Sequence, residues 1–293
     1  MKKLLLSLLF VFFVKALVIA QNKNEKFVEK SMNTPFNKIS AIMNRVDLCK
    51  ENYTKLFGGE ALTGKGTDPE LMDILQKFIF GEVFKTGSLD IKTREMITCV
   101  TLTAMQTLPQ LKTHSMAALN VGVTPIELRE VVYQCAPFIG FPRTLNAIET
   151  LNEVFKERGI ALPLETQGTV SEYNRYEKGS SIQTPLYGTE IRDALNSLPQ
   201  GMGEDVSRFL TEVCFGDFYT RNTLDIKTRE LLSICILATL GAGNQIYSHT
   251  IGNLRAGNNK ETLYAAMIQC LPYIGFPNAL NAINIIKAVD VSE

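Results

Sequence analysis

Tryptophan is absent from this chain of 293 residues, and histidine occurs only twice, as His114 and His249. Net charge is absent too, because 30 basic residues balance 30 acidic ones, and no basic stripe stands out that would favour nucleic acid as a partner. Hydrophobic residues make up 45% of the chain, which is typical of a globular protein and argues against a disordered one. We therefore expect a folded protein with a small-molecule partner.

Motifs that hold cofactors or metals are also missing. The sequence contains no G-x-G-x-x-G, no P-loop and no G-x-S-x-G. One histidine in each half of the chain, without a Cys/His cluster, falls short of the three or four ligands of a zinc site. We therefore expect no metal and no cofactor.

Cysteine is present six times but never as C-x-x-C. Most of these residues lie in apolar segments with helical periodicity, where a thiol is commonly a small buried hydrophobe. The even count permits one disulfide in an oxidising compartment. We expect mostly buried free thiols.

An apolar run at the N-terminus has the features of a targeting segment. Residues 4–14 follow Lys2 and Lys3, and small residues precede Gln21 as a cleavage site requires. The run is too short to cross a bilayer comfortably. We predict a signal peptide over residues 1–20, export to the periplasm or beyond, and no stable membrane anchor after cleavage.

The heptapeptide LDIKTRE occurs twice, at residues 89–95 and 224–230. When the chain is shifted by 135 residues against itself, residues 81–148 align with 216–283 without a gap, and 25 of the 68 positions are identical. Self-similarity over so long a period indicates two related domains rather than a solenoid.

Each copy has helical periodicity, and no strand alternation occurs. The expected helices cover 71–86, about 91–107 with Asp90 as N-cap, Pro109 to Gly122, a segment opened by the capping box at Thr124, and a segment from Pro142. The sequence thus predicts an all-α fold. Its predicted parts are a signal peptide (1–20), a polar segment (21–35), domain 1 (36–160), a linker with the first helix of domain 2 (161–187), and domain 2 (188–293).

The two histidines occupy equivalent positions, each nineteen residues after a glutamate of the repeated heptapeptide. Two antiparallel helices joined by a short turn can bring Glu95 against His114, and Glu230 against His249. A carboxylate beside an imidazole is an acid–base pair that moves protons near neutral pH. These four residues are the catalytic candidates, and the alternative is a structural pair inherited by both copies.

Four further residues are candidates for binding a substrate. Arg94 and Arg229 could hold a carboxylate, although an ion pair with a neighbouring helix is the simpler interpretation. Gln110 and Gln245 lie one helical turn before each histidine and could hydrogen-bond a ligand. The repeated IGFP predicts a tight turn before a helix, and its Phe could line a pocket.

The segments FGEVFKTGSLDIKTREMITCVTLTAM and GVTPIELREVVYQCAPFIGFPRTLNAI, with their counterparts in the second copy, resemble the carboxymuconolactone decarboxylase family. The resemblance implies two tandem helical domains of the alkylhydroperoxidase D-like fold. It also implies assembly, since single-domain members form trimers or hexamers, and a trimer of two-domain chains is expected here.

The peroxidase branch of that fold carries two cysteines near its histidine. By position they fall on Thr107 and Gln110 and on Ala242 and Gln245, so both thiols are missing from both copies. The resemblance therefore implies a cofactor-free lyase acting on a small carboxylated, lactone-like compound through the Glu–His pairs. The alternatives are a thiol-dependent redox protein using other cysteines such as Cys135 and Cys270, and a non-catalytic ligand-binding oligomer.

Overall fold

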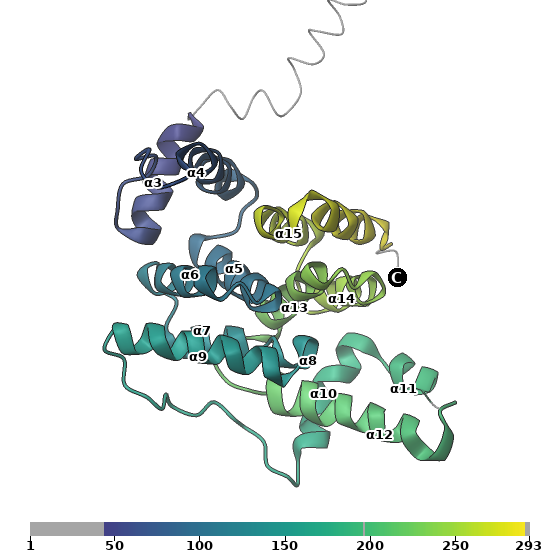
Figure 1. Ribbon diagram of the computed structural model, residues 1–293. Coiled ribbons are helices and arrows are strands. Elements are labelled where there is room, and N and C mark those ends of the chain that lie inside the picture. Colours follow the sequence, from purple (N-terminus) through teal and green to yellow (C-terminus); the bar gives the residue numbers. More distant parts are fainter. Residues whose placement is uncertain (1–43, 196, 291–293) are drawn as a thin grey trace, which may run out of the picture.

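The computed structural model describes residues 44–195 and 197–290 (Figure 1). Every regular element in these two ranges is a helix, so the predicted all-α fold is confirmed for the described part of the chain. The predicted signal peptide (1–20) and polar segment (21–35) lie outside the described residues and stay predictions.

Two sets of helices repeat the same order along the chain. The first set is α3 (Arg45–Phe57), α4 (Pro69–Gln76), the π-helix η1 (Lys77–Glu82), the 3-10 turn η2 (Val83–Lys85), α5 (Ile91–Met105), α6 (Leu108–Asn120), α7 (Pro125–Tyr133), α8 (Ala136–Ile139) and α9 (Phe141–Glu157). The second set is α10 (Arg175–Tyr187), α11 (Glu190–Leu195), η3 (Pro199–Gly201), α12 (Met202–Phe209), the π-helix η4 (Leu210–Tyr219), α13 (Ile226–Leu240), α14 (Gly243–Arg255) and α15 (Lys260–Ala288).

The helix α15 corresponds to α7, α8 and α9 together. It is broken at Gly275, where φ is 78°, and Gly140 has φ 80° at the matching break between α8 and α9. These are the glycines of the two IGFP motifs, so the predicted turn before a helix is confirmed. The phenylalanines that follow, Phe141 and Phe276, are exposed rather than turned into a pocket.

The helices that carry LDIKTRE, α5 and α13, pack against each other in the middle of the molecule. They are buried around their whole circumference, which is typical of central helices. The main apolar core therefore draws residues from both repeats. In Figure 1, α3 and α4 lie at one end of the molecule, and α10, α11 and α12 lie at the other.

The predicted helix starts at Asp90 and Thr124 are confirmed. The Asp90 carboxylate accepts a hydrogen bond from the Thr93 amide at 2.8 Å, which satisfies a donor at the start of α5. The Thr124 hydroxyl accepts from the Glu127 amide at 3.2 Å, and the Glu127 carboxylate accepts from the Thr124 amide at 2.7 Å. This reciprocal pair is the predicted capping box.

The helix expected over 71–86 differs from the prediction, because α4 gives way to the π-helix η1 and the turn η2. Contacts with α3 account for the difference. Gly81 lies so close to α3 that a Cβ on it would approach the Arg45 carbonyl oxygen to 2.2 Å, and Asn52 donates to the Phe80 carbonyl at 2.7 Å. Hydrophobic periodicity alone cannot reveal such a tertiary constraint.

Reciprocal hydrogen bonds join the two repeats. Gln269 accepts from the Arg94 guanidinium at 3.0 Å and donates to the Thr98 hydroxyl at 3.1 Å. At the equivalent place, Gln134 accepts from Arg229 at 2.8 Å and donates to the Ser233 hydroxyl at 3.0 Å. The two glutamines, which occupy equivalent positions in the two copies, thus join the repeats by equivalent hydrogen bonds.

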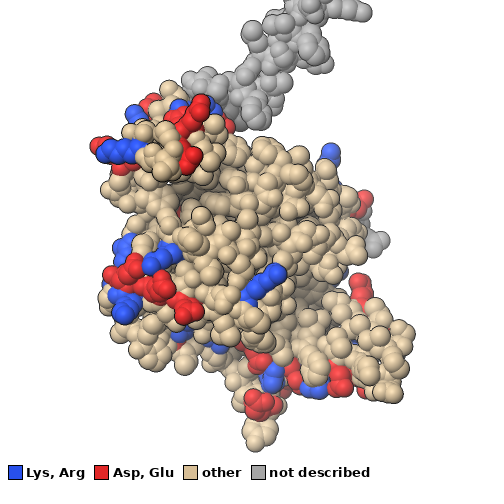
Figure 2. Space-filling model, in the orientation of Figure 1, with Lys and Arg blue, Asp and Glu red and all other residues tan. Residues whose placement is uncertain are grey.

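On the face shown in Figure 2, charged side chains are sparse over the middle and gather towards the edges. Among residues 44–195 and 197–290, no helix combines the length and apolar character needed to cross a membrane. All six cysteines belong to these residues, are buried and are free thiols, as the sequence led us to expect.

Candidate active site

The repeated heptapeptide places three functional groups at the start of a central helix. Its aspartate caps the helix, its arginine turns back onto the preceding loop, and its glutamate faces the next helix. In the first repeat the Arg94 guanidinium donates to the carbonyl oxygens of Leu89, Val83 and Thr86 at 3.1, 3.2 and 2.8 Å. Burial lowers the pKa of Arg94 to about 10, and it lowers the pKa of Arg229 as well.

The arginine donors are therefore directed at protein acceptors. Arg94 is 2% exposed and Arg229 is 0% exposed, and each reaches the glutamine of the opposite repeat. This placement favours a structural role over the substrate-binding role predicted for Arg94 and Arg229. We leave both arginines out of the proposed machinery.

Glu95 on α5 and His114 on α6 form the predicted pair of the first repeat. His114 Nδ1 lies 2.8 Å from Glu95 Oε2, the glutamate side chain is completely buried, and the histidine side chain is 10% exposed. Glu95 holds the Nδ1 side of the ring, so Nε2 is the nitrogen left to act on a ligand.

Aromatic rings from both repeats enclose His114. The ring of Phe57 on α3 lies 5.8 Å from the imidazole, and the ring of Tyr273 on α15 lies 5.7 Å from it, both edge to face. Because Tyr273 belongs to the second repeat, the first site is complete only when the two repeats are packed together.

Two residues that contact His114 each have a buried oxygen without a hydrogen-bond partner among the described residues. These oxygens are Glu95 Oε1 and the Tyr273 hydroxyl. Burial, followed by the charge of Glu95, raises the pKa of Tyr273, so this hydroxyl is a donor at neutral pH. Buried polar groups are nearly always paired in folded proteins, so two unpaired ones on residues that contact His114 call for a ligand or water.

Glu230 on α13 and His249 on α14 form the equivalent pair, with different surroundings. His249 Nδ1 lies 3.3 Å from Glu230 Oε2. The Tyr187 hydroxyl donates to that same oxygen at 2.5 Å and lies 2.8 Å from His249 Nδ1. The Tyr219 hydroxyl donates to Glu230 Oε1 at 2.9 Å. Both carboxylate oxygens of the second site are therefore occupied by protein donors.

The tyrosines of the second site replace phenylalanines of the first. Tyr219 corresponds to Phe84 at the spacing of 135 residues, and Tyr187 corresponds to Phe57 as the last residue of the first helix in its repeat. Burial, followed by the charge of Glu230, raises the pKa of both tyrosines, which keeps them protonated and donating. Phe138 takes the place of Tyr273, with its ring 5.6 Å from His249.

Gly252 makes room for the Tyr187 hydroxyl. A Cβ at this position would lie 2.5 Å from that hydroxyl oxygen and 2.9 Å from Glu230 Oε2. The equivalent residue of the first repeat is Ala117, which is buried in the cluster against which Phe57 packs. The second repeat thus has Gly252 and Tyr187 where the first repeat has Ala117 and Phe57.

Gly252→Ala is expected to destabilise the protein by about 1–3 kcal/mol, because the added methyl group must displace the tyrosine from Glu230. The higher helix propensity of alanine offsets about 1 kcal/mol at most. Adding Tyr187→Phe recreates the arrangement of the first repeat and should recover part of the loss. Urea unfolding of the two single variants and the double variant measures this coupling, and strictly additive free energies would contradict it.

Gln110 and Gln245 lie on the exposed surface at the starts of α6 and α14, one turn before the histidines. Their predicted role in ligand binding stays a prediction. Within the described ranges, no group of three or more His, Cys, Asp or Glu residues is arranged to hold a metal ion.

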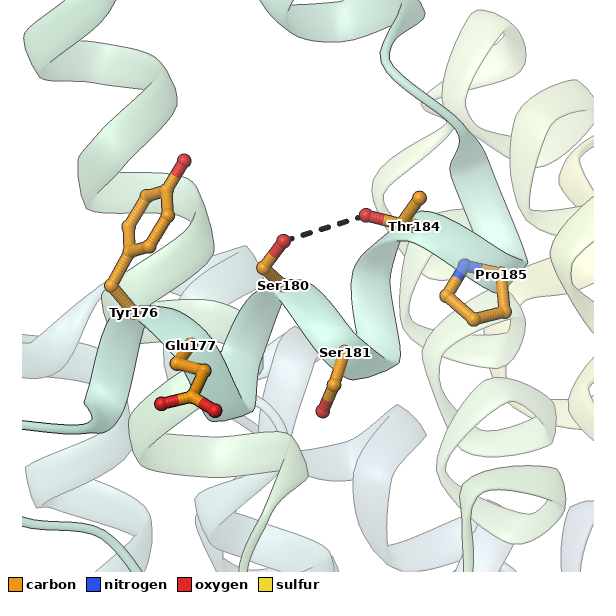
Figure 3. A pocket seen from close by; sticks show the side chains of 6 residues that line it. All are labelled: Tyr176, Glu177, Ser180, Ser181, Thr184 and Pro185. Carbon is orange, nitrogen blue, oxygen red and sulfur yellow. Dashed lines mark hydrogen bonds between the residues drawn. The ribbon is translucent and has the colours of Figure 1, made fainter.

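A hollow of about 550 Å³ lies on α10 (Figure 3), and its lining includes no residue of either Glu–His pair. Its walls are the side chains of one helix, and they include Ser180 and Thr184, whose hydroxyl oxygens are 3.5 Å apart. The lining residues are Tyr176, Glu177, Ser180, Ser181, Thr184 and Pro185. A surface hollow built by a single helix brings no acid–base pair to a ligand, so it does not enter the candidate active site.

Sequence reasoning identified both Glu–His pairs but missed the aromatic residues around them. Tyr273 and Phe138 stand at matching positions of LPYIGFP and APFIGFP, and a comparison of the two copies residue by residue would have found this exchange. Tyr187 was harder to find, because α3 and α10 lie outside the ungapped alignment.

Two segments of the chain, residues 69–153 and 204–288, match the model of the carboxymuconolactone decarboxylase family. Each segment contains one Glu–His pair. The chain belongs to the carboxymuconolactone decarboxylase family. The tandem duplication predicted from the repeated heptapeptide is confirmed by this double match.

Three relatives of this family member match only part of it. The 4-carboxymuconolactone decarboxylase of Acinetobacter baylyi is 34% identical over 92 residues, which are 31% of this chain and 69% of the relative. An uncharacterised 15.0 kDa protein of Paracoccus denitrificans is 34% identical over 87 residues, 29% of this chain and 64% of its own. A nitrosuccinic acid decarboxylase of Metarhizium robertsii is 28% identical over 86 residues, 28% of this chain and 60% of its own.

Proposed function

We propose that this carboxymuconolactone decarboxylase family member is a cofactor-free decarboxylase of small carboxylic acids. The observation that carries the proposal is the buried contact of 2.8 Å between His114 Nδ1 and Glu95 Oε2, in a site walled by both repeats. Family membership and two relatives that are named as decarboxylases support the same reaction class.

The two acids named in those relatives share one chemical feature. In 4-carboxymuconolactone and in nitrosuccinic acid, a carboxylate is attached where the electron pair left by CO₂ can delocalise, onto a lactone carbonyl or a nitro group respectively. Such a reaction needs an electrostatic partner for the anionic oxygen and a proton for carbon, and neither requires a metal.

Each part of the reaction is accounted for at the proposed site. The bond between the substrate carbon and the carboxylate breaks, and CO₂ leaves. The electron pair of the broken bond stays on the substrate, which becomes an enolate or a nitronate. Protonated His114 then gives the Nε2 proton to carbon, while Glu95 holds Nδ1 and stabilises the imidazolium before the transfer. Solvent returns the proton to the imidazole and closes the cycle.

Thiol chemistry is a weaker alternative in this structure. Cys135 and Cys270 are both 0% exposed, and burial raises the pKa of Cys135, which disfavours the reactive thiolate. A proton-transfer site fits the buried Glu–His pairs better than a redox site fits these thiols.

Incubation of the protein with 4-carboxymuconolactone and, separately, with nitrosuccinic acid tests the proposal. We expect CO₂ release above the spontaneous rate and a change in the ultraviolet spectrum with at least one acid. The double variant His114→Ala/His249→Ala, prepared identically, controls for contaminating activity. Release by the wild type that does not exceed that of the double variant with either acid would remove the proposal.

A further inference from the structure

We propose that the Tyr273 hydroxyl, which the second repeat supplies, is a ligand-binding donor of the Glu95–His114 site. In this proposal the Glu95–His114 site takes a ligand. The Glu230–His249 site does not, because its own tyrosines already hydrogen-bond its carboxylate. The inference deepens the proposed function and rests on it for the identity of the ligand, a small acid with an anionic oxygen. Its structural part stands on the contacts around the two histidines.

The two sites differ in which helices carry their hydroxyl groups. In the first site the tyrosine is Tyr273, which lies on α15 of the second repeat. The positions contributed by the first repeat itself are phenylalanines, Phe57 and Phe84. In the second site this arrangement is inverted, with Phe138 on the helix of the other repeat and tyrosines at both positions contributed by the second repeat itself. The two sites thus share a Glu–His pair but present their hydroxyls from different sides.

The carboxylates of the two sites differ in how many of their oxygens have hydrogen-bond partners. Both oxygens of Glu230 accept from tyrosine hydroxyls, and Tyr187 also contacts His249 Nδ1. A ligand at this site would have to displace hydrogen bonds to a buried charged group, which are among the stronger ones in proteins. Glu95 accepts only from His114 at Oε2, and Oε1 has no partner among the described residues.

The oxygen of the Tyr273 hydroxyl is buried and has no hydrogen-bond partner in the described chain, although the residue as a whole is partly exposed. The neighbouring Thr98 hydroxyl donates its one proton to the Arg94 carbonyl at 3.0 Å and accepts from Gln269 at 3.1 Å, so it has no proton left to donate to Tyr273. The ring that carries this unpaired donor packs edge to face against His114, and a hydroxyl on such a ring is suited to the oxygen that becomes anionic when CO₂ leaves.

The test compares three tyrosine-to-phenylalanine variants of the full protein. In Tyr273→Phe, kcat for 4-carboxymuconolactone or nitrosuccinic acid should fall by about 10²-fold, the loss typical of one oxyanion donor, with a smaller change in KM. Its Tm should stay within about 2 °C of the wild type or rise, because an unpaired hydroxyl has been removed. Tyr187→Phe should lower the Tm by about 3–8 °C, because it removes a bond to a buried carboxylate.

Tyr264→Phe is the matched control, since it removes a hydroxyl from the same helix two to three turns before Tyr273 and should keep wild-type turnover. Wild-type kcat and KM in Tyr273→Phe would overturn the inference while leaving the proposed reaction intact. If the wild type decarboxylates neither acid, the proposed reaction fails, and the Tm values of Tyr273→Phe and Tyr187→Phe then test the inference about Tyr273. A fall in Tm for Tyr273→Phe as large as that for Tyr187→Phe would then overturn the inference, and an unchanged or raised Tm would support it.

Discussion

His114→Ala is expected to reduce kcat/KM for the decarboxylated acid by about 10²–10⁴-fold, the usual contribution of one general acid–base group. The imidazole is the one group of the first site that can both give and take a proton near neutral pH, and Glu95 fixes its orientation at 2.8 Å. His249→Ala should reduce kcat/KM by less than tenfold, because the tyrosine hydroxyls of the second site donate to the Glu230 carboxylate of that same site.

Parallel assays of the two single variants measure this difference directly. Each variant removes one imidazole from an equivalent helix, so each serves as the matched control for the other. Circular dichroism and thermal unfolding would show that both remain folded. Equal losses in the two variants would contradict the divergence of the sites, and a loss confined to His249→Ala would place the reaction in the second repeat.

The pairing of Glu95 with His114 could be predicted from the sequence because it depends on local geometry. The cap at Asp90 fixes the start of α5, a short turn reverses the chain, and the next helix returns alongside. The same reasoning holds at Glu230 and His249, where the repeat provides an independent instance. Capping signals and helical spacing therefore predicted the centre of each site.

The walls of the sites could not be predicted in the same way. Tyr273 reaches His114 only because α15 packs on α5, a contact between residues far apart in the chain. The role of Arg94 likewise depends on loop carbonyls and on Gln269 from the other repeat. Tertiary packing, which no local pattern encodes, directs this guanidinium at protein acceptors and favours a structural role.

The largest effect on stability is expected at Glu130 on α7, whose carboxylate forms an ion pair with Arg221 of the second repeat. The equivalent position of the second repeat is Ala265, so this ion pair has no counterpart there. The Glu130 carboxylate is completely buried and accepts from Arg221 Nε at 2.8 Å and from Arg221 Nη2 at 2.9 Å. Arg229 Nη2 lies 3.8 Å from the same carboxylate. Glu130 is therefore the counter-charge for an arginine that burial already disfavours, as the lowered pKa of Arg229 indicates.

Glu130→Ala is expected to lower the free energy of unfolding by about 3–5 kcal/mol, the range found when one partner of a buried ion pair is removed. The equivalent contact between the repeats supplies the matched control, because Ala265 stands at the position of Glu130 and Thr86 stands at the position of Arg221. The double variant Glu130→Ala/Arg221→Thr copies that neutral arrangement and should be more stable than the single variant. Urea unfolding measures both, and a single variant within about 1 kcal/mol of the wild type would show that Arg221 and Arg229 do not need this carboxylate.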